Sequence, residues 1–144
     1  MEEGKDFGST IEALKSMLTD LQPCRSDFSI EIVAGKKIIS TRSFKLGDYD
    51  GTTHRIRIFS NRCPSAKQVL ETVIHEYAHH LMWEEYHLGA LKQRVVHGKP
   101  FWDCYFKLMQ TAKIKGVFDN EKKSDDAPDF VTLRFINIFQ FLSI

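Results

Sequence analysis

The sequence SAKQVLETVIHEYAHHLM, residues 65–82, has the clearest periodic pattern in the chain and determines the fold that we expect. Apolar residues recur along it at spacings of three and four, which predicts an amphipathic helix with one face in a core. Ser65 and Gln68 have the spacing of a capping box, so the helix is predicted to begin at Ser65, or with Pro64 as its first residue.

Two histidines and a glutamate in this helix form the pattern His75-Glu76-Tyr77-Ala78-His79. Residues four apart lie about 40° apart around a helix and one turn along it, so both imidazoles can reach one ion. Zinc suits imidazole ligands and takes about four contacts near 2.0 Å. Glu76 can take a proton from a water at the metal and pass it to a leaving amine. The pattern predicts a zinc site on the side of the helix opposite the apolar stripe; the alternative is a pair of solvated surface histidines.

The third protein ligand decides which class of zinc site this is. A metzincin would have glycine and histidine where this chain has Met82 and Glu85, so that class is excluded. His97 is the best candidate, because it follows a linker and directly precedes another predicted helix, which would return it to the first pair. His80, His87 and His54 are weaker candidates. A glutamate ligand is disfavoured, because Glu84 and Glu85 lie too close along the same helix and Glu121 lies in the acidic loop.

Other segments predict two more helices and three strands. Helical periodicity covers residues 9–21, and a further helix is predicted from near Pro100 to a stop at Gly116. β-branched and aromatic residues favour strands over residues 28–33, 38–44 and 54–59, with a turn at residues 47–51. In meander order these strands would make a small antiparallel sheet.

The length of 144 residues and the apolar content of 42% fit one globular domain. We expect an α+β domain over residues 1–116: a minimal zincin-like unit with the small antiparallel sheet packed on the active-site helix, an N-terminal helix and a following C-terminal helix. Residues 117–144 form an acidic loop and an apolar segment, for which a strand and a short amphipathic helix both stay open.

Cysteine usage and hydropathy indicate the compartment. Cys24, Cys63 and Cys104 are an odd number with no close pair, so they predict reduced thiols in a cytoplasmic protein. The acidic start of the chain lacks the apolar run of a secretory signal, and no stretch reaches the roughly 20 apolar residues that span a bilayer. We therefore expect no membrane partner.

Charge is balanced overall at +1, but residues 28–116 carry 14 basic and 8 acidic side chains. The balance argues against binding nucleic acid by bulk charge, and an ordinary solvated surface explains the local excess. Weak DNA contact through this basic middle is the alternative. Its candidate residues are Arg55, Arg57, Arg62, Lys67, Lys92, Arg94 and Lys99.

The sequence VIHEYAHH at residues 73–80, followed after a linker by HGKPFW at residues 97–102, resembles the SprT-like zinc metallopeptidases. The strand sequence HRIRIFSN at residues 54–61 also fits the layout of that family. The resemblance implies zinc ligation by His75, His79 and His97, with Glu76 as the catalytic base. It further implies hydrolysis of protein substrates, including proteins that are associated with DNA or crosslinked to it.

Two other functions stay open from the sequence. One is a DNA-associated binding module that keeps zinc for structure and does not cleave, and the other is a peptidase dedicated to one partner protein such as a repressor. A structural zinc site has no need of Glu76, which disfavours the binding module. The donor that would stabilise the oxyanion is open among Tyr77, Tyr86, Tyr105 and His87. Trp83, Phe101 and Trp102 are expected to pack in the core rather than to bind substrate.

Overall fold

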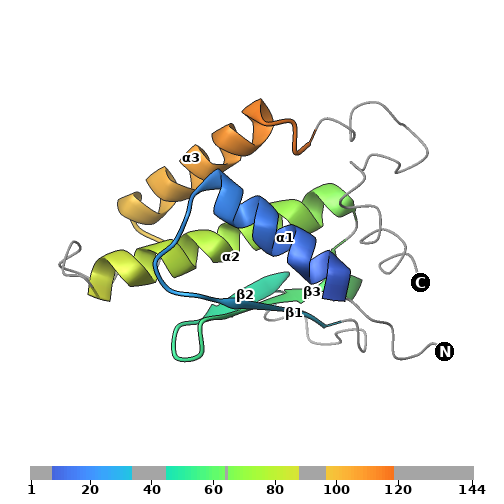
Figure 1. Ribbon diagram of the computed structural model, residues 1–144, viewed down its shortest axis with the longest axis horizontal. Helices are drawn as coiled ribbons and strands as arrows, with labels where there is room; N and C mark the ends of the chain where they lie inside the picture. The colour runs from blue at the N-terminus through green and yellow to red at the C-terminus, as the bar shows by residue number, and fades with distance from the viewer. Residues whose placement is uncertain (1–7, 34–44, 64, 88–96, 119–144) are drawn as a thin grey trace.

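The computed structural model describes residues 8–33, 45–63, 65–87 and 97–118. Its helices are α1 (Gly8–Leu21), α2 (Ala66–His87) and α3 (Lys99–Ile114), with one 3-10 turn at Ser60–Arg62. Its strands are β1 (Ser29–Val33), β2 (Gly47–Asp50) and β3 (Arg55–Phe59). The expected α+β class, a small sheet with three helices, is confirmed (Figure 1).

The sheet is mixed, so the expectation of an all-antiparallel meander is wrong. The strand order is β1-β3-β2, with β1 parallel to β3 and β2 antiparallel to β3. The parallel register sets Ile30 beside Ile56 and Ile32 beside Ile58. Three of these four side chains are buried and Ile32 is partly buried, so this pairing puts one apolar face of the sheet against the helices.

Strand β2 forms where the sequence predicted a turn. Asp48 lies opposite Arg57 in the antiparallel register, and the two side chains form an ion pair at 2.5 Å. Tyr49, between two aspartates, packs instead against the core. This alternation and the cross-strand pair explain why a turn-prone sequence extends as a strand. The turn itself follows at residues 51–54, and the strand predicted at 38–44 lies outside the described residues.

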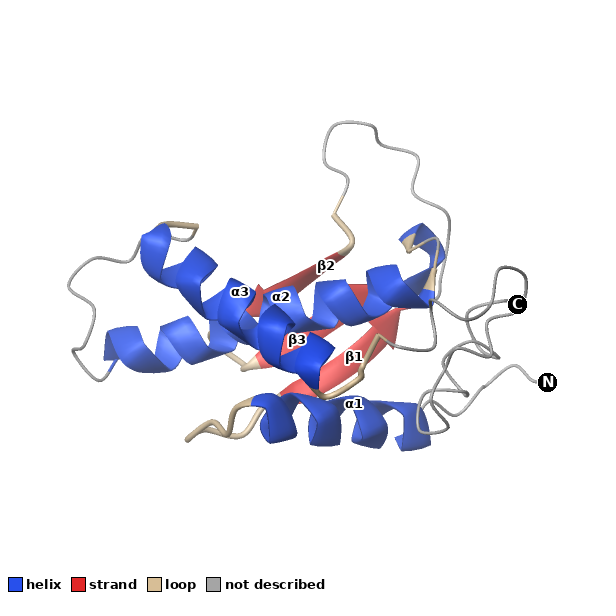
Figure 2. Cartoon of the chain, turned by 90° about the horizontal axis from the view of Figure 1, so that it is seen from above, coloured by secondary structure: helices blue, strands red, loops and turns tan. Residues whose placement is uncertain are grey.

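Helix α2 forms the middle layer of the domain. It packs on β2 and β3 on one side and on α3 on the other, while α1 covers β1 (Figures 1 and 2). The backbone N–H of Gln68 donates to Ser65 Oγ at 3.2 Å, which confirms the predicted cap. His75 and His79, which the sequence placed opposite the apolar stripe of this helix, are half-buried, so they are not the solvated surface pair that was the alternative.

The core extends through all three layers to the end of the described chain. Tyr77 of α2 is completely buried, and its hydroxyl donates to the carbonyl of Gln22 just after α1. Phe118, two residues past the predicted domain boundary, is also buried in this core. Residues 119–144 lie outside the described part of the chain. Among the described residues, no helix is long and apolar enough to cross a membrane.

Candidate metal centre

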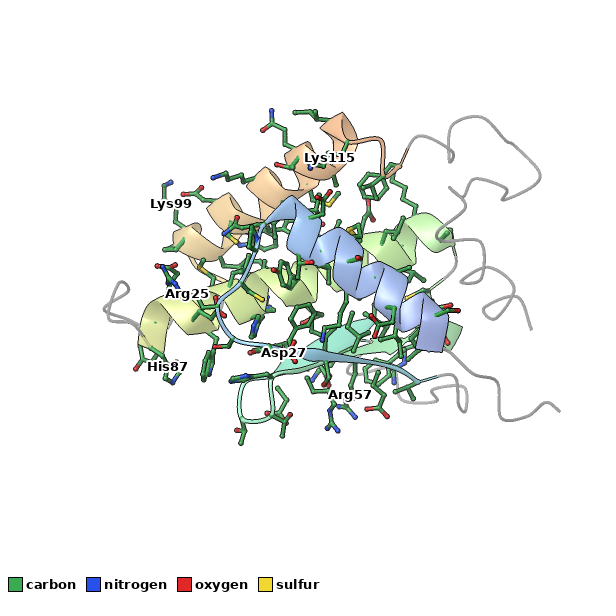
Figure 3. The ribbon with its side chains drawn as sticks, viewed as in Figure 1. Arg25, Asp27, Arg57, His87, Lys99 and Lys115 are labelled. Atoms are coloured by element: carbon green, nitrogen blue, oxygen red, sulfur yellow. The ribbon has the colours of Figure 1, made fainter. Side chains whose placement is uncertain are left out.

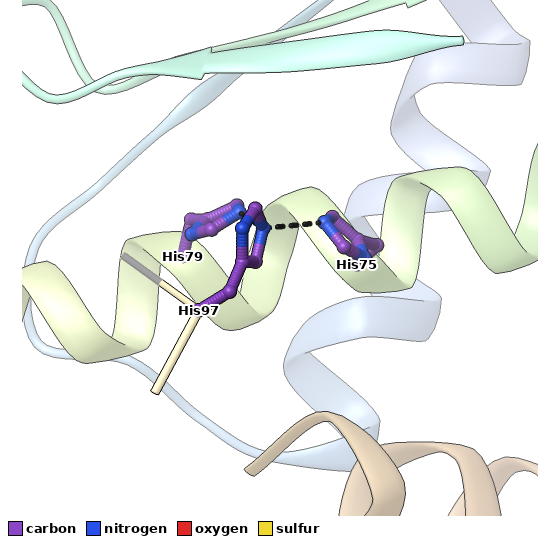
Figure 4. A group of neighbouring side chains, drawn as sticks. All are labelled: His75, His79 and His97. Atoms are coloured by element: carbon purple, nitrogen blue, oxygen red, sulfur yellow. Dashed lines mark hydrogen bonds between the residues drawn. The ribbon is translucent and has the colours of Figure 1, made fainter. Parts of the chain in front are cut away.

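Three histidine side chains meet between α2 and the start of α3. His97 Nε2 lies 3.1 Å from His79 Nε2 and 3.3 Å from His75 Nε2. His75 and His79 sit one turn apart on α2, and His97 directly precedes Gly98, the N-cap residue of α3. Figure 4 shows the His97 ring approaching both α2 rings from in front of the helix. The structure thus brings together the three residues that the sequence selected as ligands; we call them the histidine triad.

The spacing of the triad nitrogens fits a shared metal ion. Ligands held about 2.05 Å from a tetrahedral zinc ion are separated by about 3.3 Å, which is close to the two Nε2 distances found here. Hydrogen bonding alone does not account for this arrangement, because one Nε2 carries at most one proton, and His97 Nε2 faces two other ring nitrogens. A cation bound where the three Nε2 lone pairs converge would accept all three.

Aromatic packing holds the triad rings in place. Phe101, in the first turn of α3, is buried and stacks on His79 with ring centroids 4.4 Å apart. The same ring contacts His75 and His97 edge-on, at 4.9 Å in each case. Burial lowers the pKa of His75 to about 4 and that of His79 to about 3, with the neighbouring triad histidines adding to both shifts. Both imidazoles are therefore neutral at pH 7, which is the state that binds metal.

Glu76 follows His75 on α2, and the charge of Asp48 on β2 acts on its carboxyl group. Its side chain is only 7% exposed, and it does not join the triad nitrogens as a ligand. Burial raises the pKa of its carboxyl to about 8; the charge of Asp48 adds to the increase and Lys45 opposes it. A carboxyl group whose pKa is close to neutral pH can both accept and donate a proton. A metal cation nearby would favour its ionised form.

A second group of potential ligands, Cys24, His80 and Glu84, lies one turn further along α2. Its atoms already have hydrogen-bond partners. Tyr49 O–H donates to His80 Nδ1 at 2.7 Å, and His80 Nε2–H donates to the carbonyl of Ser26 at 2.9 Å, since that carbonyl can only accept. Glu84 Oε2 accepts from the backbone N–H groups of Arg25 and Ser26, at 2.9 and 2.5 Å.

This second group therefore fixes the loop between α1 and β1 onto α2. Sequence reasoning missed this role for His80 and Glu84, which it considered only as weak ligand candidates. The sequence held a sign of this role. His80 and Glu84 are polar residues four apart on α2, and both lie on the buried side of that helix. Both are fully or almost fully buried, so each needs a partner.

The remaining ligand candidates lie away from the triad. His87 Nδ1 is 2.9 Å from the carbonyl of Trp83, and its ring stacks on the indole of Trp83. His54 also packs against that indole, edge to face, with centroids 4.3 Å apart. Glu85 pairs loosely with Arg25 at 4.0 Å, and Glu121 lies outside the described residues.

Trp83 and His87 also line a groove of about 640 Å³ beside the hairpin of β2 and β3. Its other walls are polar: Asp48, Tyr49, Asp50, Gly51, Thr52, Arg55 and Arg57. Trp83 is thus half-buried at the groove wall rather than inside the core.

Among the proposed oxyanion donors, only Tyr105 has its ring beside the triad in the described part of the chain. Its ring centroid lies 5.5 Å from that of His75. Tyr77 donates its hydroxyl to Gln22 in the core, and Tyr86 packs edge-on against His87 at the end of α2. The geometry therefore narrows the four candidates to Tyr105.

The described candidates for DNA contact do not form one surface. Arg57 lies under the sheet and Lys99 at the start of α3, on the opposite side of the molecule (Figure 3). Four of them are close to carboxylates: Arg55 to Glu31, Arg57 to Asp48, Lys67 to Glu71 and Lys99 to Asp103. Arg62 donates to the carbonyl of Lys45 and stacks on Phe59, whereas Lys92 and Arg94 lie outside the described residues.

Comparison of the chain with protein-family models, with curated proteins and with solved structures gives no match.

Proposed function

We propose that the chain is a zinc-dependent metallopeptidase, of the kind suggested by its resemblance to the SprT-like enzymes. The observation that carries the proposal is the convergence of three Nε2 atoms, with neighbours 3.1 and 3.3 Å apart, beside a buried glutamate that is not a ligand. Three histidine ligands leave one position of a tetrahedral ion open, which is typical of catalytic rather than structural zinc.

The residues of the chain have separate parts in this reaction. His75, His79 and His97 hold the ion, which when bound lowers the pKa of a water molecule and polarises a carbonyl group. Glu76 takes the proton of the attacking water on its carboxylate and passes it to the nitrogen of the leaving amine. One C–O bond forms and the peptide C–N bond breaks, with no net change in the protonation of Glu76.

The buried glutamate argues against a purely structural zinc site. Burying a carboxyl group that is only 7% exposed has a free-energy cost, and a metal held only for structure gains nothing from it. The described arginines and lysines among the DNA-contact candidates are scattered, and four of them are close to carboxylates, so they give no support to DNA as the main partner. The substrate class that we propose is therefore a protein, with DNA contact as a secondary possibility to be tested by salt-dependent binding.

The test is cleavage of an unstructured protein by the zinc-loaded chain and by Glu76→Gln. This substitution keeps the side-chain volume and should keep one equivalent of zinc, but we expect cleavage to fall by about a hundredfold or more because the proton acceptor is lost. Glu71→Gln is the matched control, since Glu71 lies on the same helix and pairs only loosely with Lys67, at 4.0 Å. Equal cleavage by Glu76→Gln and wild type would contradict the proposal, as would zinc loading without any cleavage.

A further inference from the structure

One side of α3 exposes aromatic rings. Trp102 is 37% exposed and Phe106 is 59% exposed, although both are large apolar side chains. Their rings stack with centroids 5.6 Å apart, and Tyr105, half-buried, contacts both. We call Trp102, Tyr105 and Phe106 the aromatic surface. Exposed contiguous rings are unfavourable in water and are characteristic of binding sites.

The aromatic surface begins at the histidine triad. The Trp102 ring stacks on His97 with centroids 5.7 Å apart and lies 6.0 Å from the ring of His75. Phe101, the preceding residue, is 1% exposed and lies in the core under the triad. The sequence suggested a core position for both residues; it was right for Phe101 and wrong for Trp102. The helix therefore separates two adjacent aromatic residues into one that supports the site and one that borders it.

We propose that the aromatic surface binds an apolar or aromatic side chain of the peptide substrate, adjacent to the bond that is cleaved. The inference rests on the proposed function and names the substrate class of that same site. A peptide carbonyl held at the triad places the neighbouring residue about 4 Å along the chain, since successive Cα atoms are about 3.8 Å apart. Its side chain extends further from there and can reach the Trp102 ring, whose centroid lies 5.7 Å from that of His97 and 6.0 Å from that of His75.

The chemistry of the surface favours an apolar occupant. The Lys99 ammonium, at the start of the same helix, is held by Asp103 at 2.7 Å, so these two charges offset each other. Among the described residues of α3, those nearest the triad offer ring surface, and binding there gains about 25 cal/mol for each Å² of apolar area removed from water. Because Lys99 and Asp103 are already paired, neither is free to bind an acidic or basic substrate side chain, which would lose hydration there.

The first experiment measures the cleavage of a set of quenched fluorescent peptides that differ at the two positions flanking the scissile bond. We expect kcat/KM to be about tenfold or more higher for Phe or Leu than for Gly or Asp on one side of that bond. Trp102→Ala and Phe106→Ala should reduce this preference to about twofold or less. Ile114→Ala is the matched control, because Ile114 is exposed on the same helix at its far end.

The second experiment measures binding without turnover. A labelled peptide with Phe beside the scissile position is titrated into Glu76→Gln and into Glu76→Gln combined with Phe106→Ala, and its anisotropy is followed. We expect about tenfold weaker binding to the double variant, and no such loss for a Gly peptide. The double variant with Phe106→Leu, which keeps apolar area at the site, should recover part of the affinity.

The outcomes separate the two proposals. Cleavage that depends on Glu76 but shows no preference for an apolar side chain would overturn this inference and leave the proposed function intact. Selective binding without any cleavage would overturn the proposed function while supporting the aromatic surface as a recognition site. A concentration-dependent dimer that Phe106→Ala dissociates, or oligonucleotide binding that Phe106→Ala abolishes while peptide selectivity persists, would assign the rings to another occupant and overturn the inference.

Discussion

The Nε2 atoms of His79 and His97 lie 3.1 Å apart, although 18 positions of sequence separate the two residues. Two features close this distance: Gly98 caps α3 directly after His97, and Phe101 stacks on His79 from the first turn of that helix. The ligand that comes from outside α2 is thus placed by packing of α3 on α2. We expect metal binding to depend on that packing as well as on the histidines.

The metal content of purified protein tests the triad directly. We expect one equivalent of zinc in the wild type and a loss of most of it in His97→Ala, because two imidazoles alone bind zinc weakly. His97 is exposed, so its removal should leave the fold intact. Elemental analysis after dialysis gives the measurement, and circular dichroism reports the fold.

His87→Ala is the matched control for this measurement. His87 is also an exposed histidine, but it stacks on Trp83 away from the triad. Zinc content should stay at one equivalent in that variant. Loss of zinc from His87→Ala together with full retention in His97→Ala would overturn the ligand assignment.

Removal of the Tyr49 hydroxyl tests the buried network around His80. Tyr49→Phe leaves His80 Nδ1 without its donor inside the protein, so we expect the free energy of unfolding to fall by about 1–2 kcal/mol. Tyr86→Phe, at the end of α2, should change it by about 0.5 kcal/mol or less. Urea denaturation curves provide both values; equal stability of Tyr49→Phe and wild type would show that the hydroxyl does not hold His80.

The sequence contained the information for some of these features but not for others. The start of α2 and two of the triad ligands follow from local spacing, because a helix places residues four apart on one side. The pairing of β1 with β3 depends on residues 26 positions apart, and β2 forms through the cross-strand pair of Asp48 with Arg57. Neither is visible in local propensity. The separation of Phe101 from Trp102 likewise depends on where α2 lies.

Two glycines determine how closely β2 and its turn approach their neighbours. A Cβ at Gly47 would lie 2.5 Å from the carbonyl oxygen of Arg57 and 2.8 Å from Thr72 Cγ2 on α2. A Cβ at Gly51 would lie 2.7 Å from the indole of Trp83, a half-buried side chain that has more freedom to move.

We therefore expect Gly47→Ala to be more destabilising than Gly51→Ala, by about 1 kcal/mol or more, because backbone cannot yield without distorting the sheet. Thermal denaturation of the two variants measures the difference. Gly51→Ala should also change the fluorescence of Trp83, whose ring it displaces. The reverse order of stability would mean that β2 is not packed on α2 as closely as the structure indicates.

The three thiols should react slowly with alkylating reagents in the folded protein. Burial raises the pKa of all three, and for Cys104 it raises the pKa to about 11. Since only the thiolate reacts, about one in a thousand Cys104 side chains is reactive at pH 8, and its rate should rise about tenfold per pH unit between pH 7 and 9 without a plateau. Iodoacetamide labelling, followed by mass spectrometry of peptides, measures each rate.

The control is the unfolded protein. In guanidinium the Cys104 thiol should react faster, and its rate should level off above the usual thiol pKa of about 8.5. A Cys104 rate that levels off near pH 8 in the folded protein would contradict its burial against α2.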